Sequence, residues 1–167
     1  MKKWIHKYQY LQEELKDIKK QNSGYQKEMM LQYEDTTPEE VTPKQKILPS
    51  RIPDNPGKPL FKVISKVLHP DKGGDEKMFA KASDLYREKN TLGLYLMALE
   101  YNLEVEDLIC GDMIESFEEC CNQKEKEINQ IKTTVSWTWG TLSQNPKQKE
   151  LFDKYLEETH QLKKKTP

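Results

Sequence analysis

Cysteine is scarce in this sequence and is not arranged as metal ligands are. The 167 residues contain three cysteines, Cys110, Cys120 and Cys121. They form no CxxC pair and have no histidine nearby at the spacing of a zinc site. The sequence therefore indicates neither a metal site nor a cofactor. An odd number of cysteines, two of them adjacent, is typical of a reducing cytoplasm, where a free cysteine is usually a small buried apolar side chain.

Long apolar runs are also missing. The first seven residues, Met1 to Lys7, are basic, but charged residues follow them where a signal peptide would be apolar. No apolar run approaches the length that crosses a bilayer. We therefore expect a cytoplasmic protein with no membrane partner.

An excess of charge of one sign is absent as well. Lys and Arg number 27 against 28 Asp and Glu, which leaves a net charge of -1. No bulk field attracts nucleic acid, so we do not expect it as a partner. Charged residues make up 33% of the chain against 35% hydrophobic ones, a ratio typical of long helices with solvated outer faces. Because strand signals are missing too, the predicted fold is all-α.

Residues 1–34 predict one amphipathic helix with a heptad seam. Its members recur at alternating steps of four and three residues. They are Trp4, Tyr8, Leu11, Leu15, Ile18, Asn22, Tyr25 and Met29. Such a seam packs either on another helix of the same chain or on a second chain. A lone asparagine on it can fix the register and the number of partners.

Prolines interrupt residues 35–58, which we interpret as a linker with one short helix after Thr37. Residues 59–103 form a compact helical block. Residues 104–167 predict a long helix from Val105 to Leu142 and a last amphipathic helix that begins at Asn145-Pro146. The seam of the long helix is Ile114, Phe117, Cys121, Lys124, Ile128, Ile131, Val135, Thr138 and Leu142. The inner face of the last helix is Leu151, Phe152, Tyr155, Leu156 and Leu162.

The two seams predict a coiled-coil-like hairpin within one chain. Tethered helices meet at a high effective concentration, whereas two separate chains lose translational freedom on association. We therefore favour a monomer. A dimer stays open, because a buried Asn22 could pair with its own copy.

The block 59–103 contains a helix, a loop and a second helix. Lys58, Lys62 and Lys66 line up along one face of the first helix, opposite a broad apolar arc. That arc consists of Leu60, Phe61, Val63, Ile64, Val67 and Leu68. Pro70 ends the helix and biases His69 to an extended backbone, while Gly73-Gly74 supplies a turn. Asp75 is placed to cap the second helix.

These residues resemble the J domains of DnaJ-type co-chaperones. The shared features are the aromatic eight residues before the histidine, the string His69-Pro70-Asp71, and the helical pattern Phe79, Ala82, Leu85, Tyr86. The run from His69 to Tyr86 is particularly similar to the J domain of polyomavirus T antigens, so a viral or phage origin is plausible and the location would then be the host cytoplasm. The resemblance covers residues 59–90.

The resemblance implies a DnaK-type chaperone ATPase as the partner. Lys62, Lys66 and Lys72 would contact an acidic face of that chaperone. His69, Pro70 and Asp71 would form the loop that stimulates its ATP hydrolysis. The usual J domain also begins with a helix that carries a tyrosine-x-x-leucine-glycine motif. Here the proline-rich linker stands in its place, so either the N-terminal helix replaces it or the domain is a reduced variant.

The alternative is a helical adaptor, whose long helices bind an unknown client and carry the hairpin as an addition. An enzyme is not expected, since no nucleophile-base pair, phosphate loop or metal cluster is visible. His69 and Asp71 could be imagined as an acid-base pair, but we expect Pro70 to turn their side chains apart.

Overall fold

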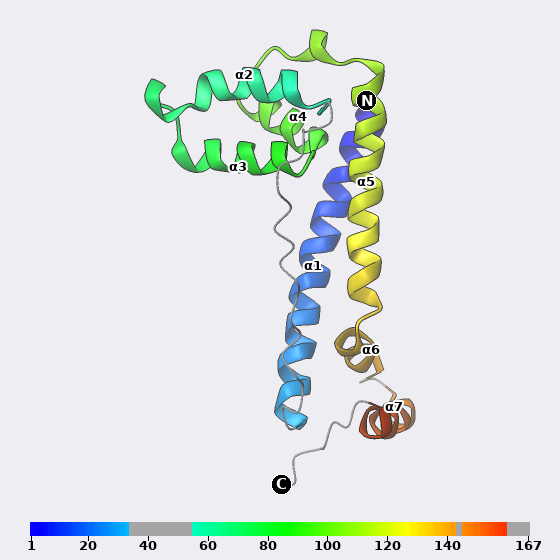
Figure 1. Ribbon diagram of the computed structural model, residues 1–167. Helices are drawn as coiled ribbons and strands as arrows, with labels where there is room; N and C mark the ends of the chain where they lie inside the picture. Colours follow the sequence, from blue (N-terminus) through cyan, green and yellow to red (C-terminus); the bar gives the residue numbers. More distant parts are fainter. Residues whose placement is uncertain (34–54, 143–144, 160–167) are drawn as a thin grey trace. The chain divides into compact units, whose positions relative to one another are not determined.

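The computed structural model describes residues 1–33, 55–142 and 145–159, and this part of the chain consists of helices joined by turns and loops, with no strand. The all-α prediction is confirmed. The α-helices, shown in Figure 1, are α1 (Lys2–Gln32), α2 (Lys58–Leu68), α3 (Glu76–Arg87), α4 (Thr91–Glu100), α5 (Gly111–Lys132), α6 (Val135–Thr141) and α7 (Pro146–Thr159). Two 3-10 turns, η1 (Pro70–Lys72) and η2 (Glu106–Leu108), lie between them. The linker up to residue 54 and the short helix expected after Thr37 lie outside the described residues.

The chain forms two compact units that differ from the four segments marked by sequence character. The first unit comprises residues 1–11 and 47–124, and the second comprises residues 12–46 and 125–167. The long helices α1 and α5 each contribute to both units, because one stretch of α1 lies beside one stretch of α5 in each (Figure 1). The segment boundaries at 34, 58 and 103 stay a prediction.

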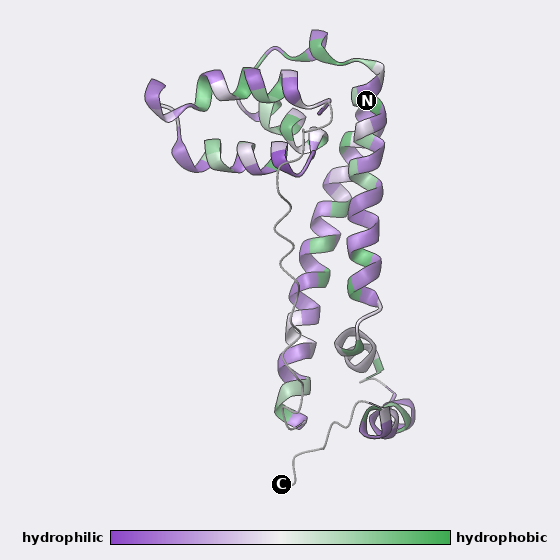
Figure 2. Cartoon of the chain, viewed as in Figure 1, coloured by the Kyte–Doolittle hydropathy of each residue, from purple (hydrophilic) through white to green (hydrophobic). Residues whose placement is uncertain are grey.

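The seam predicted for α1 is confirmed. Its central positions are at most 8% exposed and its ends are half-buried, while the positions between them are mostly exposed. Figure 2 shows this alternation as hydrophobic patches on a largely hydrophilic α1. In the first unit the Cys121 thiol of α5 donates to the carbonyl oxygen of Trp4 at 3.8 Å. In the second unit Lys132 pairs with Glu14 at 3.0 Å. The two seams therefore meet within one chain.

Asn22 has its polar partners in the same chain. It is 8% exposed, and its Oδ1 accepts hydrogen bonds from the Ser136 hydroxyl at 2.9 Å and the Thr134 hydroxyl at 3.3 Å. Because these partners supply its hydrogen bonds, the buried amide of Asn22 does not need to pair with Asn22 of a second chain. This favours the hairpin within one chain over the asparagine-paired dimer.

The prediction of one helix from Val105 to Leu142 is wrong. The helix α5 begins at Gly111 and ends at Lys132, and α6 follows as a separate helix. The break comes from two threonines whose hydroxyls bond back to the preceding turn: Thr133 to the Gln130 carbonyl at 2.8 Å and Thr134 to the Ile131 carbonyl at 2.7 Å. Thr134 has an extended backbone and accepts from the Trp137 N–H as the N-cap of α6. Hydroxyl side chains compete in this way with the helical hydrogen bonds.

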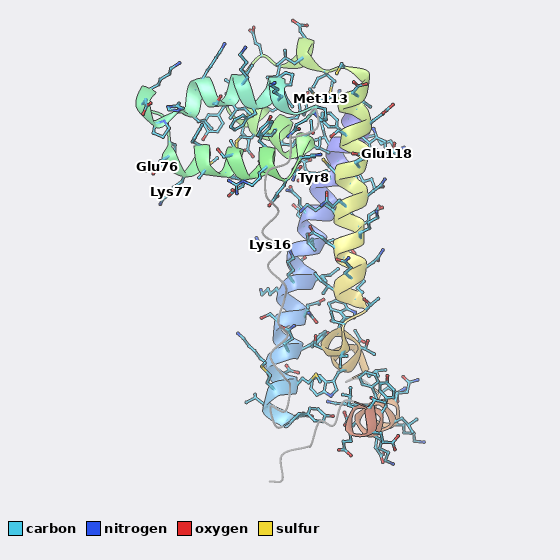
Figure 3. All side chains as sticks on the ribbon, viewed as in Figure 1. Tyr8, Lys16, Glu76, Lys77, Met113 and Glu118 are labelled. Atoms are coloured by element: carbon cyan, nitrogen blue, oxygen red, sulfur yellow. The ribbon has the colours of Figure 1, made fainter. Side chains whose placement is uncertain are left out.

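The start of the second seam is also shifted. Ile114 was expected on the inner face, but it is 41% exposed, whereas its neighbour Met113 is 1% exposed. Met113 is labelled on α5 in Figure 3. Phe117, Cys121 and Ile128 are buried as predicted.

The inner face of α7 differs from the prediction as well. Leu151 and Tyr155 are 67% and 49% exposed, and Leu162 lies outside the described residues. The buried positions are Asp153 and Leu156. The Asp153 carboxylate accepts hydrogen bonds from the Tyr33 hydroxyl at 2.5 Å and from the Trp139 indole N–H at 3.2 Å. These two donors draw a charged side chain into the core of the second unit and so rotate the inner face of α7.

Candidate functional site

The candidate site is the hairpin of α2 and α3, which belongs to the first unit. The helix α2 has Pro59 in its first turn, where the missing N–H costs nothing. Leu60, Ile64 and Leu68 recur every four residues and are at most 2% exposed. The predicted apolar arc is narrower than expected, because Val67 is 47% exposed.

The lysines of α2 lie on the opposite face from this core. Lys58, Lys62 and Lys66 are all exposed, at successive steps of four residues. Lys72, in η1, is exposed as well. The hairpin thus presents four cations along α2 and the loop.

The loop after α2 has the backbone that the sequence predicts. His69 is extended, with φ -62° and ψ 129°, and Pro70 opens the turn η1. Gly73 has φ 78°, in the left-handed region that favours glycine. At Gly74 a Cβ atom would collide with the backbone carbonyl group of Leu68. Each of the two glycines is therefore required for a different reason, and together they fold the chain back onto the end of α2.

The expectation that Pro70 turns His69 and Asp71 apart is wrong. The His69 Nδ1 atom accepts from the Asp71 N–H at 3.3 Å and lies 3.5 Å from the Asp71 carboxylate. Phe79 of α3 lies edge-on to the His69 ring, with the ring centroids 5.1 Å apart. The histidine is therefore held on two sides, although its side chain is 42% exposed.

Asp75 caps α3, as the sequence predicts. Its carboxylate accepts from the N–H groups of Lys77 and Met78 at 2.9 and 3.2 Å. Figure 3 labels Glu76 and Lys77, which mark this loop end of α3. Ala82 is fully buried against the core of the hairpin.

A row of half-buried rings runs along the hairpin away from the loop. The ring centroids of Phe79 and Phe61 are 6.4 Å apart. Phe61 stacks on Tyr86, with 4.5 Å between the ring centroids and an angle of 15° between the ring planes. Together with His69, these rings connect α2 and α3 from the loop to the far end of α3. Offset stacking of this kind stabilises the pairing of the two helices by about 1 kcal/mol per pair.

The helix α4, which sequence reasoning did not single out, completes the hairpin. It packs on both α2 and α3. Its buried residues are Thr91, Leu92, Gly93, Leu94, Tyr95, Met97 and Ala98. Figure 2 shows α4 as mostly hydrophobic, in contrast to α1. The signal in the sequence was the apolar run from Leu92 to Leu99, which has no polar face and so predicts a helix covered on several sides.

The start of α1 also contacts this block. Tyr8, fully buried, accepts a hydrogen bond at its hydroxyl oxygen from the Asn90 side chain at 2.6 Å. Asn90 in turn caps α4 by accepting from the Gly93 N–H at 2.9 Å. Burial raises the pKa of Tyr8 to about 12. The hairpin thus has helices before and after it, although none carries the tyrosine-x-x-leucine-glycine motif.

The six predicted site residues therefore lie on one continuous stretch of the hairpin. Lys62 and Lys66 are on α2, and His69, Pro70, Asp71 and Lys72 follow in the loop. Over residues 1–33, 55–142 and 145–159, no group of histidine, cysteine and carboxylate side chains gathers as metal ligands would. No helix in the same ranges is both long and apolar enough for a bilayer.

Comparison with protein family models, with curated proteins and with solved structures finds no match to this chain. What the hairpin does has to be inferred from its own residues.

Proposed function

We propose that this chain is a J-domain co-chaperone, which binds a DnaK-type chaperone and stimulates its ATP hydrolysis without doing chemistry itself. One observation carries the proposal: His69-Pro70-Asp71 forms an ordered, exposed loop at the end of a helix whose outer face is a row of lysines. Specific polar groups on a rigid base and a basic approach surface are what recognition of an acidic protein face requires.

The physical roles of the two parts differ. The lysines of α2 attract an acidic surface over a distance set by the ionic strength, so they act mainly on the rate of association. The loop acts after contact, because the hydrogen bonds that His69 and Asp71 would make with the partner form only at short range. The edge contact with Phe79 supports one orientation of the His69 ring.

Single-turnover ATP hydrolysis tests this proposal. The purified chain is added to a bacterial and to a eukaryotic DnaK-type chaperone preloaded with ATP, and the hydrolysis rate is compared with that of the chaperone alone. We expect stimulation with at least one of them. His69→Gln and Asp71→Asn should lose it, with unchanged helix content by circular dichroism. His6→Gln, an exposed histidine on α1, is the matched control. Equal stimulation by all the variants would reject the proposed role of the loop.

A helical adaptor is the second candidate, and one feature of the second unit favours it. Leu31 near the end of α1 and Leu151 on α7 are 75% and 67% exposed. Contacts of exposed apolar side chains with a partner would remove them from water, which stabilises a complex. Leu31→Glu with Leu151→Glu should then abolish client binding while stimulation of the chaperone persists. The adaptor would be favoured if the wild type stimulates neither chaperone but binds a partner, and if the double variant no longer binds that partner.

A further inference from the structure

The hairpin contains a hollow that the proposed function does not use. It has a volume of about 320 Å³ and belongs to the first unit. Its lining residues come from the start of α2 and the end of α3, so it lies at the end of the hairpin away from the His-Pro-Asp loop (Figure 1). They are Asn55, Phe61, Ser83, Tyr86, Arg87 and Lys89.

The hollow combines aromatic rings with two cations. Phe61 and Tyr86, which stack on each other, supply apolar surface. Arg87 and Lys89 are exposed. Arg87 pairs with Asp84 at 3.0 Å, but a guanidinium has five N–H donors and can bind a second carboxylate. A suitable ligand has an aliphatic side chain, which would contact the rings, and carboxylates on either side of it, which would pair with Arg87 and Lys89.

The turn that ends α3 places Lys89 in the lining of the hollow. Lys89 follows α3 in the left-handed region, with φ 55°. Its N–H donates to the Tyr86 carbonyl at 3.1 Å, and the Asn90 N–H donates to the Leu85 carbonyl at 2.8 Å. Helix ends of this kind usually have glycine or asparagine at the left-handed position. At the end of α4 the corresponding residue is Asn102, with φ 52°. The Lys89 carbonyl oxygen also accepts from the Thr91 N–H at 2.9 Å, so backbone hydrogen bonds fix this turn and hold Lys89 at the rim of the hollow.

A row of ring contacts links the hollow to the His-Pro-Asp loop. The rings of His69, Phe79, Phe61 and Tyr86 follow one another from the loop to the hollow. Phe61 precedes His69 by eight residues, which is about 12 Å along a helix. One protein partner can therefore cover both ends of this row.

We propose that the hollow is a second anchor site for the chaperone, and that it takes an aliphatic side chain from an acidic segment of that partner. The inference rests on the proposed function, since it assigns the occupant to the same chaperone. It separates two tasks on the hairpin: the loop stimulates hydrolysis, and the hollow strengthens binding.

Two measurements test the inference on the full chain. The first is a titration with the peptide acetyl-Asp-Glu-Leu-Glu-Asp-amide, followed by NMR, against the same peptide with lysines in place of its acids. The second is the chain concentration that gives half-maximal stimulation of the chaperone. The variant is Lys89→Gly, which removes the cation and relieves the left-handed backbone. Asn102→Gly is the matched control, because it makes the same backbone change away from the hollow.

We expect the acidic peptide to shift the signals of Phe61, Tyr86 and Lys89, and the basic peptide to leave them unchanged. Lys89→Gly should weaken peptide binding and raise the half-maximal concentration by up to about fivefold, the scale of one lost exposed charge contact. Its maximal stimulation should be unchanged and its melting temperature should not fall. Asn102→Gly should bind as the wild type does.

The outcomes separate this inference from the proposed function. If the wild type stimulates the chaperone and Lys89→Gly has the wild-type half-maximal concentration, the hollow is not an anchor while the co-chaperone function stands. If acidic and basic peptides bind equally, the charge argument is wrong. If the wild type stimulates neither chaperone, the proposed function fails, the chaperone is no longer the occupant, and the peptide titration alone shows whether the hollow binds acidic segments.

Discussion

The two glycines of the loop, Gly73 and Gly74, are required for different structural reasons, and each can be tested by a single substitution. Gly74→Ala places a methyl group against the Leu68 carbonyl group, and because backbone cannot yield as a side chain can, we expect a loss of about 1–3 kcal/mol in the free energy of unfolding. Gly73→Ala should cost about 1–2 kcal/mol, because of its positive φ. Chemical denaturation measures both.

The control for these changes is Gly24→Ala on α1. Gly24 has nothing within 4 Å of its would-be Cβ and lies in a helix, so alanine should stabilise by up to about 1 kcal/mol. A Gly74→Ala variant as stable as the wild type would mean that the loop can move away from the end of α2.

Tyr8 makes the stability of the first unit sensitive to alkali. Burial is the main cause that raises the pKa of this phenol to about 12 from its usual value near 10, and the Asn90 contact partly opposes it. The folded state therefore holds the phenol proton between pH 10 and pH 12, where the unfolded state has lost it. This stabilisation is fully present below pH 10 and is lost as the pH rises towards 12, by on the order of 2–3 kcal/mol.

Denaturation midpoints from pH 8 to pH 11.5 test this expectation. Tyr8→Phe should reduce the loss of stability at high pH. Some of this loss should remain, because burial also raises the pKa of Tyr33 and Tyr95. Tyr10→Phe, at an exposed position on α1, is the control. An alkaline profile of Tyr8→Phe that superimposes on the wild type would show that this hydroxyl does not titrate between the two states.

At the scale of one element, α2 is expected to act through its charge. Reversal of Lys62 and Lys66 to glutamate should slow association with the chaperone at low salt by about tenfold, with a smaller effect on dissociation, because steering acts before docking. Added salt should weaken binding of the wild type and reduce the difference in association rate between the wild type and the variant. Stopped-flow association rates across a salt series measure this.

The chain offers a matched control on another helix. Lys16 and Lys20 of α1 have the same four-residue spacing, are exposed, and lie in the second unit; Lys16 is labelled in Figure 3. Their reversal should leave the association rate nearly unchanged. If both pairs have the same effect, the attraction comes from total charge and not from the face of α2.

How far the sequence predicts an element depends on how local its determinants are. The seam of α1 and the cap at Asp75 follow from residues a few positions apart, and both were predicted correctly. The face of α7 was predicted only in part: Leu156 is buried and Phe152 packs beside it as expected. Asp153 was not expected there, because a hydrogen bond from Tyr33, 120 positions away, buries it. The length of α5 was also predicted wrongly, although Phe117, Cys121 and Ile128 are buried as expected. A single seam through residue 142 assumes a continuous helix, whereas Thr134 begins a new one.

The candidate site divides in the same way. The backbone of His69, Gly73 and the start of α3 could be predicted from proline, glycine and capping rules. The edge contact between His69 and Phe79 and the hollow beside Tyr86 could not, because they depend on how α2 and α3 pack. The role of α4 was also missed, since the family pattern directs attention to a helix before the hairpin.

At the scale of the whole molecule, the paired seams predict a monomer. Asn22 is satisfied by Ser136 and Thr134 in its own chain, and the central seam positions of α1 are buried without a second copy. We expect sedimentation velocity at micromolar concentration to show one species of about 19.7 kDa. Deletion of residues 1–23 should uncover Ile128 on α5 and lower solubility. A stable dimer of the intact chain would mean that the helices pair between copies.

The pairing of α1 with α5 has a further consequence during synthesis. Trp4 and its partner Cys121 are 117 positions apart, and α1 is made long before α5. At about 5–20 residues per second, α1 leaves the ribosome on the order of ten seconds before its partner exists. For that time its seam of tyrosine, leucine and isoleucine is uncovered on the nascent chain. Such an apolar segment is prone to contacts with other chains, so the newborn protein has the greatest need of protection before α5 is made.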